Sequence, residues 1–118
     1  GTGVSIQSES DNNVVRGNYI GVGADGTTPL GNGGWGVFVN SSTAIAIGGS
    51  VSGSGNRIWN NGNKGVHVYD LAEPFSSASI LGNSIGANVG LGIDLHPAGA
   101  SPNDVGDGDI GPRRGGLA

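Results

Sequence analysis

Five side chains suited to carbohydrate chemistry recur at fixed offsets from short apolar repeats. Phe38, His67 and Asp94 each follow a Gly-apolar dipeptide, and Tyr69 and His96 lie two residues beyond His67 and Asp94. Because residues two apart share one face of a β-strand, we expect all five to point outward from one sheet. Aromatic rings interleaved with hydrogen-bonding groups can stack on sugar rings, so this face is the candidate carbohydrate-binding surface. The alternative is an ordinary half-exposed sheet face, which tolerates any residue that favours strands.

One pair on this face is a candidate for catalysis. On neighbouring strands His67 and Asp94 would lie side by side, as a general base and the carboxylate that orients it. Inverting glycoside hydrolysis needs two carboxyls about 6.5–9.5 Å apart, whereas this face offers Asp94 and has Asp70 only at its margin. We therefore expect no catalysis, with polysaccharide lyase or glycoside hydrolase chemistry as the alternative.

The C-terminal segment holds the candidate metal ligands. Asp104, Asp107 and Asp109 follow Asn103 within a few residues, and carboxylate and amide oxygens are the ligands that calcium prefers. The spacing is not that of an EF-hand, which ends in a glutamate. No cofactor is expected apart from calcium at these residues, and the alternative is a solvated acidic turn.

Composition excludes several classes of protein. Glycine accounts for 26 of 118 residues, and each costs about 1 kcal/mol relative to alanine inside a helix, so long helices are excluded. The net charge of −4 and the five Lys and Arg residues provide no basic patch, so nucleic acid is not an expected partner. No apolar run approaches the ~20 residues that span a membrane. Cysteine is absent, which excludes disulfides and thiolate metal sites.

Two short signatures repeat along the chain at spacings that vary only through loops. The shortest step from the valine of the first signature to the asparagine of the second is 18−4=14 residues. The shortest step from that asparagine to the valine of the next first signature is 66−56=10 residues, which gives 14+10=24 residues per repeat. The extra residues of the longer repeats fall in Gly-, Pro-, Asp- and Ser-rich segments, at 22–30, 48–54 and 70–75. Strands of fixed spacing with insertions confined to loops are typical of a solenoid. The first signature is Gly3-Val4-Ser5-Ile6, Gly36-Val37-Phe38-Val39, Gly65-Val66-His67-Val68 and Gly92-Ile93-Asp94-Leu95, and the second is Gly17-Asn18-Tyr19-Ile20, Gly55-Asn56-Arg57-Ile58 and Gly82-Asn83-Ser84-Ile85.

About 24 residues accommodate three short strands and three turns. We place the strands at the first signature, at residues 14–15, 45–47 and 79–81, and at the second signature. Alternation sends the Val, Ile and Leu residues of both signatures inward, and Ile85 is expected to be fully buried. Asn18, Asn56 and Asn83 should align as a structural ladder at one corner, each preceded by a glycine that allows a positive φ. Trp35 and Trp59, beside strand starts and turns, are expected to cover the coil rather than bind a ligand.

These signatures resemble the right-handed parallel β-helix repeats of the pectin-lyase-like superfamily, and among them the repeats of bacterial secreted and surface proteins. The resemblance extends from Gly3 to about Gly111. It implies an all-β fold, a right-handed parallel β-helix (solenoid) of three to four turns over residues 1–96. Residues 97–118 would form an irregular acidic tail that packs on or near the C-terminal end. The resemblance also implies an extracellular or cell-surface location and polysaccharide as a candidate ligand.

The favoured function is a structural or adhesive β-helix module of a larger secreted or surface bacterial protein. One alternative is a carbohydrate-binding or polysaccharide-degrading domain that uses the outward face of the first strand. Another is a segment of a trimeric phage-type fibre. Because the first turn leaves strand edges open, we also expect self-association through that end of the solenoid.

Overall fold

The computed structural model describes residues 1–70 and 76–96, with His96 described by its backbone alone. The described residues form ten short strands and no helix, which confirms the all-β prediction. The strands are β1 Val4–Ile6, β2 Val14–Val15, β3 Tyr19–Ile20, β4 Val37–Asn40, β5 Ile45–Gly48, β6 Arg57–Trp59, β7 Val66–Tyr69, β8 Ala78–Leu81, β9 Ser84–Gly86 and β10 Ile93–His96. The predicted tail at 97–118 lies outside the described residues.

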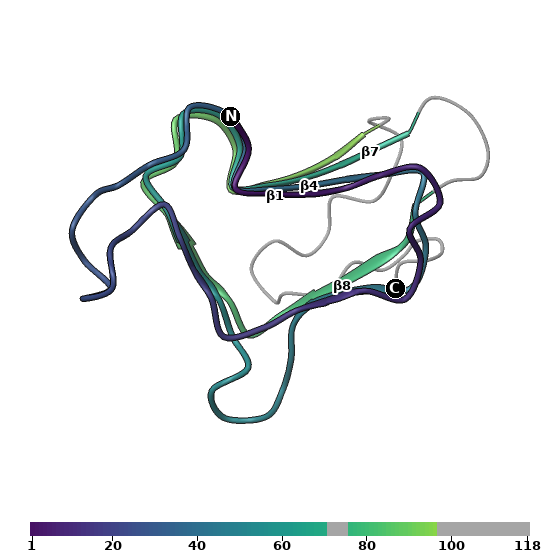
Figure 1. The fold of residues 1–118 in the computed structure, drawn as a ribbon, viewed down its shortest axis with the longest axis horizontal. Helices are drawn as coiled ribbons and strands as arrows, with labels where there is room; N and C mark the ends of the chain where they lie inside the picture. Colours follow the sequence, from purple (N-terminus) through teal and green to yellow (C-terminus); the bar gives the residue numbers. More distant parts are fainter. Residues whose placement is uncertain (71–75, 97–118) are drawn as a thin grey trace.

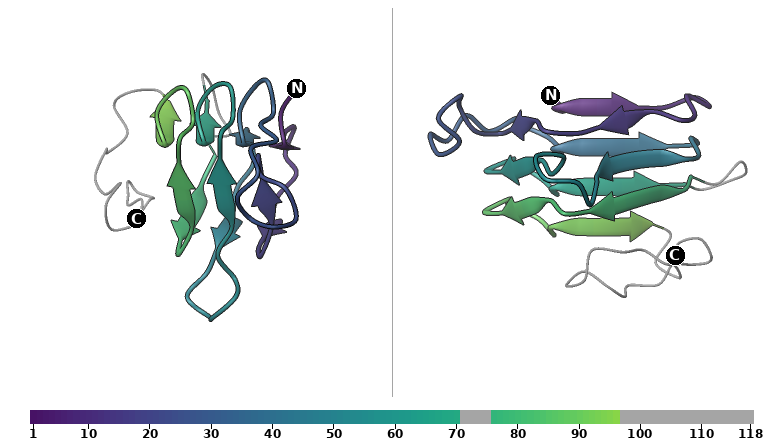
Figure 2. Two further views of the ribbon diagram at one scale, coloured as in Figure 1. Left: turned by 90° about the vertical axis from the view of Figure 1, so that its left-hand side faces the viewer. Right: turned by 90° about the horizontal axis from the view of Figure 1, so that it is seen from below.

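The strands form three parallel sheets that the chain visits in the same order each time. Sheet A is β1-β4-β7-β10, sheet B is β2-β5-β8 and sheet C is β3-β6-β9. Each group of three consecutive strands therefore contributes one strand to every sheet, and we call such a group a rung. Rungs 1, 2 and 3 are β1–β3, β4–β6 and β7–β9, and β10 begins the fourth (Figures 1 and 2). The signatures pair residue for residue, as expected: Val4 lies opposite Val37, and Val37 opposite Val66.

The apolar core runs along the stack between the sheets. It contains the inward residues of the first signature in β4 and β7, the isoleucines of β5, and Ile20 and Ile58. Ile58 is completely buried in rung 2. The prediction that Ile85 is fully buried is wrong: its side chain is only partly buried. The physical reason is its position in β9, the outermost strand of sheet C, because no further described strand covers it.

Two of the predicted insertions project from the stack (Figure 1). The loop at 22–30 is closed by an antiparallel bridge between Val22 and Pro29. Inside it, one Asp25 carboxylate oxygen accepts bonds from the main-chain N–H groups of Thr27 and Thr28, and the other accepts the Thr28 hydroxyl. These bonds hold the pKa of Asp25 well below its usual range, and the bond from the Thr28 hydroxyl lowers it most. The second projecting loop lies between β5 and β6, and the third predicted insertion falls largely on residues outside the described part.

The predicted asparagine ladder is present at the corner between sheets B and C. Asn18 donates its main-chain N–H and its Nδ2 to Oδ1 of Asn56, at 2.9 and 3.1 Å. Asn56 repeats both bonds to Oδ1 of Asn83, each at 2.9 Å. Nδ2 of Asn56 also reaches the Val15 carbonyl of the preceding rung. These bonds satisfy backbone and side-chain groups that the corner withdraws from water.

The glycines that precede this ladder do not all serve one purpose. Gly17 and Gly82 have φ of 67° and 71°, as predicted. Gly55 is not among the residues with positive φ. It is required by close approach instead, since a Cβ there would lie 2.0 Å from the Gly82 carbonyl oxygen.

A second ladder, which the sequence analysis missed, occupies the corner between sheets C and A. Asn32 donates its N–H and Nδ2 to Oδ1 of Asn61 at 3.2 and 2.9 Å, and Asn61 donates the same groups to Oδ1 of Asn88 at 2.8 and 2.9 Å. Asn61 is completely buried. Each of the three stands four residues before the glycine of a first signature, so the recurring spacing was a usable signal.

Hydroxyl groups take the same role at the corner between sheets A and B. Ser10 N–H donates to Oγ of Ser42, and Ser42 N–H donates to Oγ of Ser76, both at 3.1 Å. Asp70 is buried here and accepts bonds from Ser76 N–H, Ser76 Oγ and Ser41 N–H. Asp70 thus lies at the margin of the outward face, directly after β7, but these donors hold its carboxylate inside the corner.

Candidate functional site

The outward face of sheet A carries the predicted residues in the predicted columns. Phe38 pairs with His67 and His67 pairs with Asp94, so the three lie in one column across β4, β7 and β10. In the next column Tyr69 pairs with Asn40 on one side and with His96 on the other. The side chain of His96 lies outside the described part of the structure.

Four rings cluster on this face, and we call them the aromatic patch: Trp35, Phe38, His67 and Tyr69. Trp35 stacks on Phe38 with 4.6 Å between ring centroids and 15° between planes, and on His67 at 5.4 Å and 17°. Tyr69 is tilted against His67 at 5.5 Å and 39°. Stacked and tilted arrangements at these distances are those that aromatic pairs prefer. Trp35 therefore covers the sheet, as the sequence analysis expected.

This cover changes the character of the predicted binding surface. The sequence predicted a strip of exposed side chains, but His67 is only 5% exposed, and Phe38 and Tyr69 are partly buried. The reason is Trp35, whose ring lies over Phe38 and His67. The side chains point away from the core, as alternation requires, yet they pack on one another rather than standing free in solvent.

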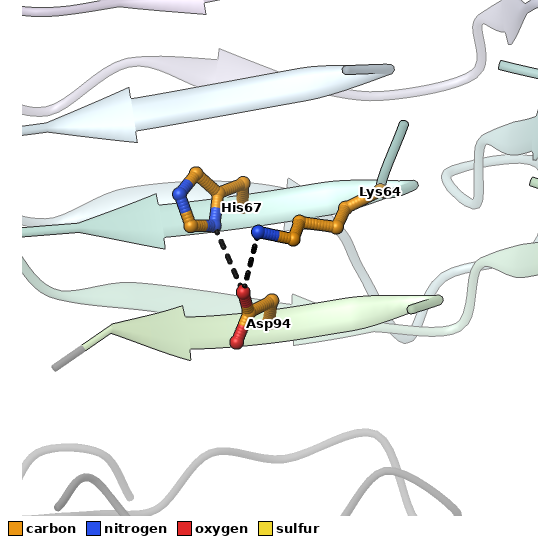
Figure 3. A network of polar contacts seen from close by, with 3 residues as sticks. All are labelled: Lys64, His67 and Asp94. Carbon is orange, nitrogen blue, oxygen red and sulfur yellow. Dashed lines mark ion pairs between the residues drawn. The ribbon is translucent and has the colours of Figure 1, made fainter. Parts of the chain in front are cut away.

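The candidate pair His67 and Asp94 lies side by side, as expected, together with one residue not assigned to the site. Oδ2 of Asp94 is 3.4 Å from Nδ1 of His67 and 2.9 Å from Nζ of Lys64 (Figure 3). A general base must reach the proton that it removes, whereas the His67 side chain is 6% exposed. Asp94 and Lys64 retain more exposure, at 24% and 28%, so the open part of this site is an ion pair.

Trp35 and Lys64 occupy equivalent places in successive rungs. Each directly precedes the glycine of a first signature, and each contacts a residue of the following rung. Trp35 stacks on His67 of rung 3, and Lys64 pairs with Asp94 of the fourth. The position before the signature glycine therefore supplies the side chains that lie over sheet A.

The outward face of sheet C holds a second polar and aromatic group, which the sequence analysis did not assign. The Arg57 guanidinium lies over the Trp59 ring, with its carbon 4.3 Å from the ring centroid. Arg57 Nε donates to the Gly26 carbonyl at 2.6 Å, and Nη1 donates to Ser84 Oγ at 3.2 Å. Trp59 Nε1 donates to the same Ser84 oxygen at 3.0 Å. Trp59 thus covers its sheet, as expected, and Arg57 ties the loop at 22–30 to rungs 2 and 3.

The candidate calcium ligands Asp104, Asp107 and Asp109 lie outside the described residues. Among residues 1–70 and 76–96, no three His, Cys, Asp or Glu side chains are grouped so as to hold a metal ion. The same residues include no helix long and apolar enough to cross a membrane.

The chain matches no protein-family model, and comparison with curated proteins and with solved structures gives no match.

Proposed function

We propose that this chain is a right-handed parallel β-helix segment that serves as a structural or adhesive module of a larger secreted or surface-exposed bacterial protein. The observation that carries the proposal is the pair of asparagine ladders. They tie all three rungs together at two corners, through main-chain and side-chain bonds at every step. Each rung contacts mainly its neighbours, which is the arrangement of a solenoid that transmits load or spacing along its axis.

The geometry of His67 and Asp94 favours a module without catalysis. The imidazole is closed off beneath Trp35, and the carboxylate that would orient it is engaged by Lys64. A substrate would have to displace an aromatic ring and an ion pair before it reached the base.

Two measurements test this proposal. An experimental structure would give the handedness of the chain directly. Turnover of a panel of polysaccharides that includes pectate, followed by release of reducing ends and by absorbance of unsaturated products, should stay at background. Turnover that is lost in Asp94→Asn but kept in Asp25→Asn would reject the structural role in favour of an enzyme.

A carbohydrate-binding module is the second candidate, and the aromatic patch favours it. Trp35, Phe38 and Tyr69 are all partly exposed on one sheet face, and Asp94, which lies beside the patch, is paired with Lys64. Such a surface suits a neutral glycan better than a polyuronate, which would need several cations. Titration with neutral oligosaccharides should shift the Trp35 indole resonance and not that of Trp59, and Trp35→Ala should abolish the shift of the patch residues. Shifts of equal size at both indoles would contradict a site at the patch.

A further inference from the structure

The outward face of sheet C holds a cation whose described contacts are all with neutral groups. Arg57 bonds to the Gly26 carbonyl and the Ser84 hydroxyl and stacks on the Trp59 indole. Its side chain is partly buried. Within the described residues both ion pairs involve Asp94, on the outward face of sheet A. Withdrawing part of a guanidinium from water is unfavourable, and a carboxylate that pairs with it offsets that cost.

The geometry leaves the end of this guanidinium available. Arginine has five N–H donors in a rigid plane, and the bonds to Gly26 and Ser84 use Nε and one N–H of Nη1. The plane is fixed from one side by Trp59 and from its edges by a loop carbonyl and a hydroxyl. What remains is one N–H of Nη1 and both N–H groups of Nη2, which can donate to a carboxylate. Because the guanidinium is already held in place, binding would cost little side-chain entropy.

We propose that this face binds a carboxylate side chain of a partner protein, with Arg57 as the anchor. Charge is the first argument, since an acidic side chain supplies the counter-ion that the described residues do not. Composition is the second: Tyr19, Arg57 and Trp59 stand together on the outward face, and these three residue types dominate the centres of protein interfaces. Tyr19 is 55% exposed and lies against Gly26 of the same loop that holds Arg57.

A sugar ring fits this surface less well than a protein side chain. Sugar binding relies on an open aromatic face, but Arg57 covers the Trp59 ring. The ring also packs against Gly86, where a Cβ would lie 2.9 Å from its carbon atoms. Trp59 therefore serves to orient the guanidinium and is not a free platform. The site is separate from the aromatic patch on sheet A and does not depend on carbohydrate binding there.

The test uses short blocked peptides as probes of the carboxylate. A tetraglutamate peptide is titrated into the full chain at low salt, with a tetraglutamine peptide as the neutral control, and the side-chain N–H resonances of Arg57 and Trp59 are followed by NMR. We expect saturable shifts with tetraglutamate and none with tetraglutamine. Arg57→Met should lower the affinity about 10- to 100-fold, the range for a hydrogen-bonded charge.

Two further variants separate the proposal from simpler explanations. Arg57→Lys keeps the charge but lacks the planar guanidinium, so it should lose most of the affinity while the fold is retained, which also guards against a misfolded Met variant. Arg16→Met removes a cation that bonds to the Gly48 carbonyl and should change the affinity less than twofold. Equal losses of tetraglutamate affinity in the Arg16 and Arg57 variants would show that binding depends only on net charge, and would overturn the proposal. Binding of a uronate oligosaccharide without binding of tetraglutamate would replace the protein partner by a glycan, and no saturable shift with either probe would reject the site.

Discussion

Removal of the buried ladder residue Asn61 gives the sharpest test of how this fold is held together. Its Oδ1 accepts bonds from Asn32 N–H and Nδ2, and its Nδ2 donates to Oδ1 of Asn88 at 2.9 Å. A further contact from Nδ2 to the Ile20 carbonyl is long, at 3.5 Å. Asn61→Ala removes three well-formed bonds worth about 1 kcal/mol each, and leaves polar groups of Asn32 without their acceptor.

The expected loss in the free energy of unfolding is about 3–4 kcal/mol, because the site is fully buried and water cannot replace the lost partner. For a chain of this size the melting temperature should fall by roughly 10–15 °C. The assay is urea denaturation followed by circular dichroism, together with a thermal scan. Asn61→Asp should cost at least as much, since it places a second acceptor against Asn88 Oδ1 and buries a charge.

The matched control is Asn18→Ala at the exposed end of the other ladder. Asn18 keeps its main-chain bond to Asn56 after truncation, and the lost Nδ2 bonds are partly replaced by water, so about 1 kcal/mol or less is expected. If Asn61→Ala destabilised the protein no more than Asn18→Ala, the ladders would not be the cross-links that we infer.

Four further outcomes follow from the same structure. Ile58→Ala should cost about 2–5 kcal/mol and Ile85→Ala clearly less, because only the first side chain is fully buried, and equal losses in urea denaturation would contradict the assigned core. The pKa of Asp25 is lowered in the folded loop. The stabilisation of the loop at 22–30 by this carboxylate is therefore complete above the ordinary carboxyl pKa and is lost as pH falls through the lowered value. NMR shifts of the Thr28 amide should report that loss, and Asp25→Asn should remove the acid-induced change. Light scattering of this chain should show self-association that grows with concentration through the edges of β1, β2 and β3, which pair with no other strand among the described residues, and a strict monomer at high concentration would refute it. Millimolar calcium should raise the melting temperature if the tail aspartates bind it. No shift relative to a chelator control would favour the alternative, a solvated acidic turn.

The strand positions and their register could be predicted from the sequence because they depend on local, repeated chemistry. Val and Ile alternate at every rung, and glycine marks the same place before each first strand, so the pairing of Val37 with Val66 follows from spacing alone. The first ladder was found for the same reason. The second ladder was missed, although an asparagine recurs four residues before the glycine of the first signature, because the loop residues around that asparagine differ from one rung to the next.

The exposure of the candidate site could not be predicted in this way. Trp35 stacks on His67, and no other first signature has an aromatic ring at that place: the equivalent residues are Thr2, Lys64 and Leu91. The contact between Arg57 and Gly26 likewise joins a strand to an insertion 31 residues away. The burial of His67 and the contact between Arg57 and Gly26 each depend on one side chain that lies over a sheet. The periodicity of the sequence does not predict such single contacts.

The direction of the asparagine bonds gives the stack an electrical polarity. In both ladders every bond between two asparagines runs the same way, with the N–H donor in the earlier rung and the Oδ1 acceptor in the later one. Aligned amide dipoles add along a column and polarise one another, so the end near Asn18 and Asn32 is partially negative and the end near Asn83 and Asn88 is partially positive. This is opposite in sign, along the chain, to the dipole of an α-helix. An anionic group is therefore favoured at the end of the rungs near Asn83 and Asn88, and a cationic group at the end near Asn18 and Asn32.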